Sequence, residues 1–473
     1  MLGLGHDGAS VMKAVLLALA SIIFLPLSAQ PQSVLNFPHV LDPADFATTG
    51  FAVVNSSASD ATATFSLFGA DGSALSTSQQ PVRKGGQIAK LGSQLFGASA
   101  SGWVQVTSAT TGIQGFWFAG DLVTFGDGAE PATSASELVL PVIAPSSEIH
   151  IANTGTVPET IVMDLLSGDG LDVDERFVQQ IPPRGFFKAN TAAIFPKADL
   201  TQATHMRLKC GCAGNPFAAL VVTRNFIAAP SSVVLNAVPV STSTSVITFP
   251  HLVDGAQGNA NWKSVVSVTN LSATPNDVTI VFTADNGTTQ TVQRTIQPNG
   301  TIREMAGDMF GFTTGFQSGW VRVSSASLPI TGFLAYAETV GAGVTAVSAQ
   351  VDAQPNLLFA QIADLPPWWT GLALLNPGQK PASVEIFAMN PDGSLIGNAS
   401  ARFSLAAGSK VAKLLSEWVP ATQNRSSDGG FIFVRSDLPL FGIELFFSRS
   451  TQILANVPAA KIPPGSYVPP PSR

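Results

Sequence analysis

Two cysteines, Cys210 and Cys212, are the residues of this chain whose type and spacing most directly suggest covalent chemistry. Two cysteines in an oxidising environment are usually joined, but a bridge across a single residue requires the chain to turn, which Gly211 would allow. Free thiols are the alternative interpretation. A Cys-x-Cys pair without further ligands is weak support for a metal or redox role. The sequence therefore predicts a local disulfide between Cys210 and Cys212, and no metal or cofactor.

The histidines do not have the spacing of a catalytic site. His39 and His251 occupy equivalent Phe-Pro-His positions, but Val142 and Gln361 stand near the same place in two other parts of the chain. We therefore expect packing or hydrogen bonding at the start of a strand rather than catalysis. The sequence contains no Gly-x-Ser-x-Gly elbow, His-Glu-x-x-His pair or Walker loop. These observations predict a protein that is not an enzyme.

One acidic cluster contains Asp169, Asp172, Asp174 and Glu175. Carboxylate oxygens could bind Ca²⁺ outside the cell. The spacing matches no established calcium loop, however, and the cluster falls where a hairpin turn is expected. We therefore interpret it as a solvated acidic turn.

Five aromatic residues are candidates for contact with a ligand or partner. Trp103 and Trp320 alternate with valines, and Phe431 holds the corresponding place in a third segment. If the valines face the core, these rings face outward, where they could stack on sugar rings or pack against a partner. The alternative is that each ring covers a neighbouring loop or the adjacent module. The adjacent Trp368 and Trp369 form a second candidate patch with the same two interpretations.

The chain repeats itself over a long interval. The segment 101–116 returns as 318–333 with 10 of 16 positions identical, and self-similarity of this kind is typical of an array of similar units. Each unit shows a strand, an Asn, another strand and an Asp-Gly or Asn-Gly turn. The predicted units are 31–136, 137–242, 243–352 and 353–462. Within and between them, the small-residue segments 127–137, 238–245 and 344–355 are interpreted as short linkers.

Periodicity within a unit is that of β-structure. Val104 and Val106 alternate with Gln105 and Thr107, which indicates half-buried antiparallel strands. The Asp-Gly and Asn-Gly pairs supply the positive φ of a tight hairpin turn. Charged residues make up only 12% of the chain, fewer than helical surfaces normally carry. The predicted fold is an all-β tandem array of four antiparallel β-sandwich domains, with the best short helix at 410–418.

The two ends of the chain indicate export. Lys13 precedes the apolar run 14–25, and small residues follow near Ala29, a pattern typical of a signal peptide spanning 1–30; translation is expected to begin at Met12. The Pro-rich segment 463–473 is expected to be an extended tail. We predict no transmembrane segment in the mature chain. A net charge of −7 with no basic run argues against nucleic acid as a partner.

The chain resembles the tandem immunoglobulin-like modules of uncharacterised secreted bacterial proteins. The resemblance is carried by the segments 369–377 and 262–270 and by the later Ser-Gly-Trp-Val strand. The similarity covers the whole mature chain and is carried by turn and core residues. It implies an immunoglobulin-like sandwich fold and an extracellular setting, without a catalytic residue to transfer. The inter-sheet disulfide of antibody domains has no counterpart here, because the only cysteines are Cys210 and Cys212.

The sequence therefore predicts a secreted or extracellular protein that is structural or adhesive and is associated with the cell surface. Its repeated sheet faces would be presented along a semi-rigid rod, where several weak contacts add together. Other surface proteins or glycans would be its partners. The alternative is a carbohydrate-binding protein that uses the outward aromatic residues of its sheets.

Overall fold

The computed structural model describes residues 33–469 apart from short segments at 98, 121–125, 213, 215, 228–230, 314, 340–342, 365, 399, 424, 426–428, 449–452, 463–465 and 467–468. The predicted signal peptide at 1–30 and nearly all of the tail at 463–473 lie outside the described residues. The described part of the chain is an all-β structure of several antiparallel sheets with a few short helices.

The first two units each contain two sheets. In unit 1 the strand orders are β1-β6-β3-β4 and β5-β2-β7-β8, and in unit 2 they are β12-β11-β14-β9-β17 and β13-β10-β15-β16. The elements of unit 1 are β1 (Ser33–Leu41), η1 (Asp45–Ala47), β2 (Gly50–Asn55), β3 (Ala61–Phe68), β4 (Ala74–Val82), β5 (Gln87–Leu91), α2 (Gly92–Phe96), β6 (Gly102–Ser108), β7 (Ile113–Gly120) and β8 (Gly126–Ala129). Those of unit 2 are β9 (Glu137–Leu140), β10 (Ser147–Asn153), β11 (Glu159–Ser167), β12 (Phe177–Ile181), β13 (Phe186–Asn190), α3 (Thr191–Ile194), β14 (Ala203–Cys210), β15 (Phe217–Arg224), β16 (Ser232–Asn236), β17 (Val238–Pro239) and η2 (Val240–Thr242).

The last two units repeat this plan with longer strands. In unit 3 the hairpin of β18 and β19 links the two sheets, and in unit 4 the long strand β31 takes part in both. The elements of unit 3 are β18 (Val246–Gln257), β19 (Ala260–Asn270), β20 (Asn276–Ala284), β21 (Thr289–Ile296), β22 (Thr301–Met305), α4 (Ala306–Phe310), β23 (Gln317–Ser325), β24 (Ile330–Glu338) and β25 (Val344–Ser348). Those of unit 4 are β26 (Gln354–Phe359), β27 (Trp368–Leu375), β28 (Ala382–Met389), η3 (Ile396–Asn398), β29 (Ala401–Leu405), β30 (Lys410–Leu414), α5 (Leu415–Trp418), η4 (Pro420–Thr422), β31 (Phe431–Ser448), β32 (Ile453–Pro458) and β33 (Ala460–Lys461). The helix expected at 410–418 therefore begins only at Leu415, because the first half of that segment pairs with β27.

A buried asparagine recurs at the end of one strand in every unit. Its side-chain amide donates to the backbone carbonyl four residues further on, at 2.8 Å in each case, and to a carbonyl at the end of a neighbouring strand. The four residues are Asn55, Asn153, Asn270 and Asn376. Since a buried amide must satisfy its hydrogen bonds, this side chain holds the following turn in the same conformation four times.

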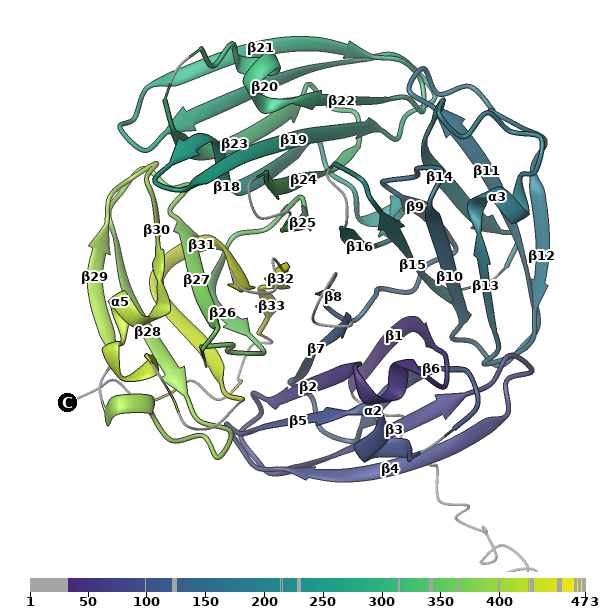
Figure 1. Ribbon diagram of the computed structural model, residues 1–473, viewed down its shortest axis with the longest axis horizontal. Coiled ribbons are helices and arrows are strands. Elements are labelled where there is room, and N and C mark those ends of the chain that lie inside the picture. Colours follow the sequence, from purple (N-terminus) through teal and green to yellow (C-terminus); the bar gives the residue numbers. More distant parts are fainter. Residues whose placement is uncertain are drawn as a thin grey trace, which may run out of the picture.

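The four units form a closed ring (Figure 1). Each apolar core lies between the two sheets of one unit and continues into the next unit. The core of unit 1 includes Leu220 of unit 2, that of unit 2 includes Phe333 of unit 3, that of unit 3 includes Ile443 of unit 4, and that of unit 4 includes Phe116 of unit 1. The expected semi-rigid rod is therefore wrong, because the last core packs against the first.

The centre of the ring is made by one strand from each unit. Figure 1 shows β8, β16, β25 and β32 nearest the common centre, where β8 and β25 each lie beside both β16 and β32. Two of these strands fall in segments that we expected to be linkers, 127–137 and 344–355. That expectation was wrong for β8 and β25, because small residues there allow four strands to approach one another closely.

Candidate functional site

In three of the four units the hairpin-turn glycine of the repeat meets a neighbouring unit. A Cβ built on Gly72 of unit 1 would overlap the carbonyl oxygen of Pro183 in unit 2, and one on Gly170 of unit 2 would overlap that of Pro298 in unit 3. In unit 4 the turn at Gly393 approaches Gly85 of unit 1 in the same way. Each of these glycines also has a positive φ. The turns that define the repeat are therefore part of the contacts between units.

Two of the three strand aromatics expected to face outward, Trp103 and Trp320, lie at junctions between units. Trp103 is fully buried, and its indole N–H donates to the carbonyl of Arg184 in unit 2 at 2.7 Å. Trp320 is partly buried and donates to the carbonyl of Gly408 in unit 4 at 3.2 Å. Phe431 is also buried. Trp103 therefore covers the adjacent unit, the second of the two interpretations that its sequence allows, and does not form an exposed ligand surface. An exposed ring is also wrong for Phe431, which is buried in the apolar core of unit 4.

His205 is the fourth member of this set, and the sequence analysis missed it. The strand register places His205 in unit 2 where Trp103 and Trp320 stand in units 1 and 3. Its Nδ1 lies 3.1 Å from the Thr301 hydroxyl of unit 3. Burial, followed by the nearby Arg303 charge, lowers the pKa of His205 to about 3, so the ring is neutral. The alternating strand around Met206 marks this position of the repeat. Sequence identity between unit 2 and the other units is too low here to align His205 with Trp103 and Trp320.

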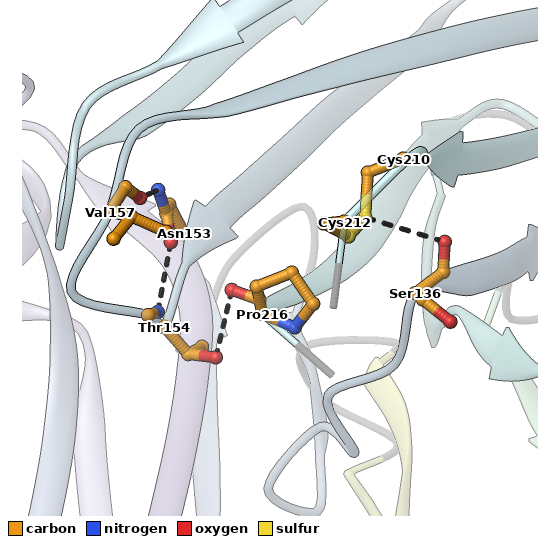
Figure 2. Close-up of a disulfide and its surroundings, with 8 residues drawn as sticks. Ser136, Asn153, Thr154, Val157, Cys210, Cys212 and Pro216 are labelled. Atoms are coloured by element: carbon orange, nitrogen blue, oxygen red, sulfur yellow. Dashed lines mark hydrogen bonds between the residues drawn. A yellow bond between two sulfur atoms is a disulfide. The ribbon is translucent and has the colours of Figure 1, made fainter. Parts of the chain in front are cut away.

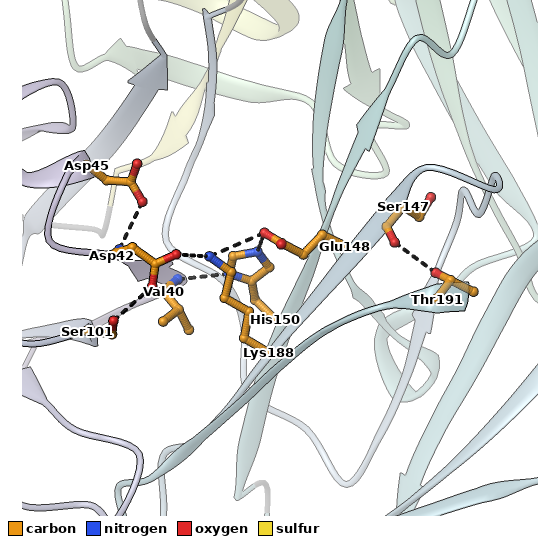
Figure 3. Close-up of polar contacts among 9 residues, drawn as sticks. All are labelled: Val40, Asp42, Asp45, Ser101, Ser147, Glu148, His150, Lys188 and Thr191. Atoms are coloured by element: carbon orange, nitrogen blue, oxygen red, sulfur yellow. Dashed lines mark hydrogen bonds and ion pairs between the residues drawn. The ribbon is translucent and has the colours of Figure 1, made fainter. Parts of the chain in front are cut away.

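A polar cluster joins units 1 and 2 (Figure 3). His150 is fully buried; its Nδ1 accepts the backbone N–H of Val40 at 2.9 Å, and its Nε2 lies 2.8 Å from the Glu148 carboxylate. Lys188 bonds to Asp42 across the junction at 2.8 Å. Burial lowers the pKa of His150 despite the carboxylate. The cluster therefore holds a neutral imidazole as a fixed acceptor and donor.

The two Phe-Pro-His histidines are also at junctions. His39 stacks between Trp117 and His150, with ring centroids 4.4 and 5.1 Å away. His251 Nδ1 lies 3.0 Å from the ammonium group of Lys410 in unit 4. The Lys410 side chain is fully buried, and its pKa is lowered by burial although Asp285 lies 3.1 Å away. His39 therefore contributes ring packing between units, and its buried Nδ1 has no hydrogen-bond partner. His251 contributes a hydrogen bond to Lys410.

Asp127 lies at the centre of the ring and contacts three other units. The backbone N–H of Val234 donates to its carboxylate at 2.9 Å, the Thr345 hydroxyl at 3.1 Å, and the backbone N–H of Asn456 also donates to it. Burial raises the pKa of Asp127 to about 8, although these hydrogen bonds act in the opposite direction. One side chain of β8 is thus bound to β16, β25 and β32.

A disulfide joins Cys210 and Cys212 at the end of β14. Figure 2 shows this bridge beside Ser136, whose carbonyl lies 3.7 Å from the Cys210 sulfur, and near the Asn153 turn. A carboxylate oxygen of Glu159 lies within 4.8 Å of both sulfurs. Because a metal ligand must be a thiolate, the bridged pair offers no sulfur ligands.

Trp368 and Trp369, the second candidate patch, lie in two different environments. Trp369 stacks on Phe447 with ring centroids 5.6 Å apart, on the side toward unit 3. Trp368 lies at the junction of units 4 and 1, where its ring meets Phe446 edge to face at 5.7 Å. There it lines a groove of about 400 Å³. The other groove residues are Thr48, Gly50, Phe51, Ala52, Ala89, Lys90, Leu91, Gln94, Phe116, Phe118, Gln361, Ile362, Ala363 and Phe446.

This Trp368 groove is the candidate binding site of the described chain. Its lining is partly aromatic and includes Phe116 and Phe118 of unit 1 and Trp368 of unit 4. Its polar members include Lys90 and Gln94. Concave sites with an apolar lining and a few polar groups are typical of small-molecule recognition. Its geometry fits an amphipathic ligand such as a sugar ring or an aromatic group.

Across the residues that the structure describes, none of the helices has the length and apolar character needed to cross a membrane. No protein-family model matches the chain, and a search of curated proteins finds no match. Among solved structures, the crystal structure of Thermotoga maritima 1070 is 12% identical, with a TM-score of 0.20, and the alignment covers 23% of this chain and 95% of that chain. A crystal structure of a tetra-tandem repeat in the extending region of a large adhesion protein is 10% identical, with a TM-score of 0.12, and covers 88% of this chain and 95% of that one. Neither TM-score supports an inference about function.

Proposed function

We propose that the protein is an exported structural or adhesive surface protein, built from four immunoglobulin-like β-sandwich modules and without a catalytic site. One observation carries the proposal: side chains capable of chemistry join the units to one another. His150, His205, Lys410 and Asp127 each bond across a junction. A catalytic group must reach its substrate, whereas these groups are committed to holding the ring together.

The ring changes how such a protein would present its surface. A rod exposes each module separately, but here neighbouring cores are continuous. The four modules would therefore move as one rigid body and offer the two broad faces of a disc. Several weak contacts on one face would be held at fixed spacing, which raises their combined strength through effective concentration.

Localisation and adhesion test this proposal together. We expect antibodies against the chain to label the cell surface or the culture medium, and beads coated with the chain to attach to cells that produce it. Beads coated with heat-unfolded chain are the matched control. Retention inside the cell, or turnover of a substrate by the purified chain, would contradict the proposal.

Carbohydrate binding is the second candidate, and the Trp368 groove is the observation that favours it. An aromatic face beside amide and ammonium groups suits the apolar face and hydroxyls of a sugar. Glycan-array binding should be lost in Trp368→Ala and kept in the matched control Trp369→Ala, whose ring packs toward unit 3. Equal binding by both variants would exclude the groove.

A further inference from the structure

The Trp368 groove has a counterpart at the junction of units 3 and 4. Trp262 precedes Asn270 of unit 3 by the same interval that separates Trp368 from Asn376 of unit 4, so the two tryptophans are equivalent. Trp262 lines a groove of about 220 Å³ together with β27, β30 and β31 of unit 4. The Trp368 groove combines β27 of unit 4 with β2, β5 and β7 of unit 1. Because β27 pairs with β30 and β31 as β2 pairs with β5 and β7, one kind of groove is present twice.

Each groove also contains a lysine from the unit across the junction from its tryptophan. The strand register makes Lys413 of unit 4 equivalent to Lys90 of unit 1. The Lys90 ammonium group donates to the neutral amide of Gln80 at 2.8 Å, and that of Lys413 lies 4.9 Å from the centre of the Trp418 ring. No Asp or Glu is among the described residues that line either groove. Each groove therefore combines one positive charge with one indole ring, although the chain as a whole has a net charge of −7.

The other two junctions lack both residues. The position of the tryptophan is taken by Ala47 in unit 1 and Pro145 in unit 2, and the position of the lysine by Ala189 in unit 2 and Glu304 in unit 3. A tryptophan and a lysine from different units thus occur together at two junctions and are both absent from the other two. Since all four junctions form without sharing these residues, the pair is not needed to close the ring. It is better explained by a ligand that contacts both side chains.

We propose that the Trp262 and Trp368 grooves are two equivalent binding sites for the acidic sugars of one glycan chain. This inference rests on the carbohydrate-binding candidate above and names its ligand class. The apolar face of a sugar ring would stack on the indole, and the sugar carboxylate would form a charge-assisted hydrogen bond with the lysine. Both tryptophans are half-buried, so each ring keeps an exposed part for this contact. A polymer that repeats one sugar fits a site that the protein repeats.

The ring places both grooves on the same face of the molecule. Its four units follow one another in a closed circle (Figure 1), so equivalent junctions present equivalent grooves to the same side. Both grooves include residues of unit 4, whose core is continuous with those of units 3 and 1. The two sites are thus held at a fixed separation. A glycan that reaches both would bind more tightly than a short one, through effective concentration.

Titration with a galacturonate disaccharide tests the number of sites and their ligand class. By calorimetry the wild-type chain should bind two molecules, Trp262→Ala and Trp368→Ala one each, and the double variant none. Lys413→Gln and Lys90→Gln should each weaken binding at one groove about tenfold. Methyl esterification of the sugar carboxylate should weaken binding to wild type at both grooves by the same factor. Lys197→Gln changes an exposed lysine of unit 2; it is the matched control and should bind as wild type does.

Polygalacturonate on a glycan array tests whether the two grooves act together. Its signal should be lost in either tryptophan variant, because each keeps only one groove, while the disaccharide still binds that groove in solution. If Trp262→Ala binds both ligands as wild type does, the pair of sites is overturned and the carbohydrate-binding candidate survives with the Trp368 groove alone. Equal affinity for the disaccharide and its methyl ester would overturn the acidic ligand. The lysine variants keep the test decisive if a tryptophan variant does not fold.

Two other outcomes would overturn the inference in different ways. Absence of binding to every glycan would remove both this inference and the carbohydrate-binding candidate, whereas the adhesive role is decided by the bead assay. Binding to phosphatidylglycerol vesicles that the two groove lysine variants lose, without binding to glycans, would assign the grooves to a lipid headgroup instead.

Discussion

Trp103 contributes both its volume and a hydrogen bond to the junction of units 1 and 2. Trp103→Phe keeps most of the ring but removes the N–H that donates to the Arg184 carbonyl. A buried carbonyl left without a donor costs about 1–3 kcal/mol, and we expect the free energy of unfolding to fall by that amount in urea titrations. Trp320→Phe is the matched control, because its bond is longer at 3.2 Å and the ring is partly exposed.

Similar stability losses in these two variants would contradict the prediction. If Trp103→Phe and Trp320→Phe lower the free energy of unfolding by the same amount, or do not lower it, the indole N–H does not stabilise the junction. The far-ultraviolet circular dichroism of both variants should match wild type, so that the comparison is between folded rings.

Individual site residues were the least predictable part of this molecule. Strand alternation placed Trp103 on the face opposite the core valines, which is correct, but a period of two says nothing about what lies against that face. His205 shares the position with a different side chain, so residue identity could not reveal it. Glu444 gave no signal either: it is fully buried on β31, whereas a lone carboxylate in a strand is normally interpreted as solvated.

The repeated glycine turns show how one element can act both within and between units. Gly170 and Gly287 have similar positive φ values, 75° and 84°. A Cβ built on Gly170 would overlap Pro298 of the next unit, whereas a Cβ built on Gly287 would have no atom within 4 Å. Gly287→Ala should therefore cost about 1–2 kcal/mol from backbone conformation alone. Gly170→Ala should cost clearly more and should accelerate hydrogen exchange at 298–301, where the turns meet.

Equal destabilisation by the two alanines would show that the turn contact contributes nothing to the junction. Gly393→Ala extends the test to the closure of the ring, because a Cβ there would approach the carbonyl oxygen of Gly85 in unit 1. Its effect should resemble that of Gly170→Ala rather than that of Gly287→Ala.

Elements were predicted better than residues. The four Asn positions and the Asp-Gly turns have local geometric requirements, so they could be recognised from sequence, and every named strand pairs only with strands of its own predicted segment. The segments around Asp127 and Val344 were misread as linkers. A strand of four or five small residues has no apolar alternation, and β8 and β25 are held by contacts with other units.

At the scale of the whole molecule, polar groups between the first and last units act together with their shared apolar core to close the ring. The Gln87 side chain of unit 1 donates to the carbonyls of Ala360 and Gly430 in unit 4 and accepts the Gly430 N–H at 2.7 Å. Such long-range pairing leaves no periodic trace in the sequence, since any amide could serve. Repeats alone therefore predict the number of units but do not distinguish a rod from a ring.

Asp127 should make the stability of the ring depend on pH. In the unfolded chain its carboxyl loses a proton near pH 3.8, whereas in the folded ring burial raises the pKa to about 8. Between these values the folded state retains a proton that the unfolded state has released, so a rise in pH favours unfolding. The stabilisation is fully present below about pH 4 and is lost as pH rises through about 8, with a slope of at most about 1.4 kcal/mol per pH unit.

Asp127→Asn removes this titration while keeping the shape of the side chain and an oxygen that can accept the Gly128 N–H and the Thr345 hydroxyl. The variant loses an acceptor for Val234 and should be less stable at pH 4. We expect urea titrations from pH 4 to 8 to show that the difference in the free energy of unfolding between wild type and variant becomes smaller as pH rises. A constant difference would mean that Asp127 has the same charge in both states, and that the four central strands are held by an ionised carboxylate throughout.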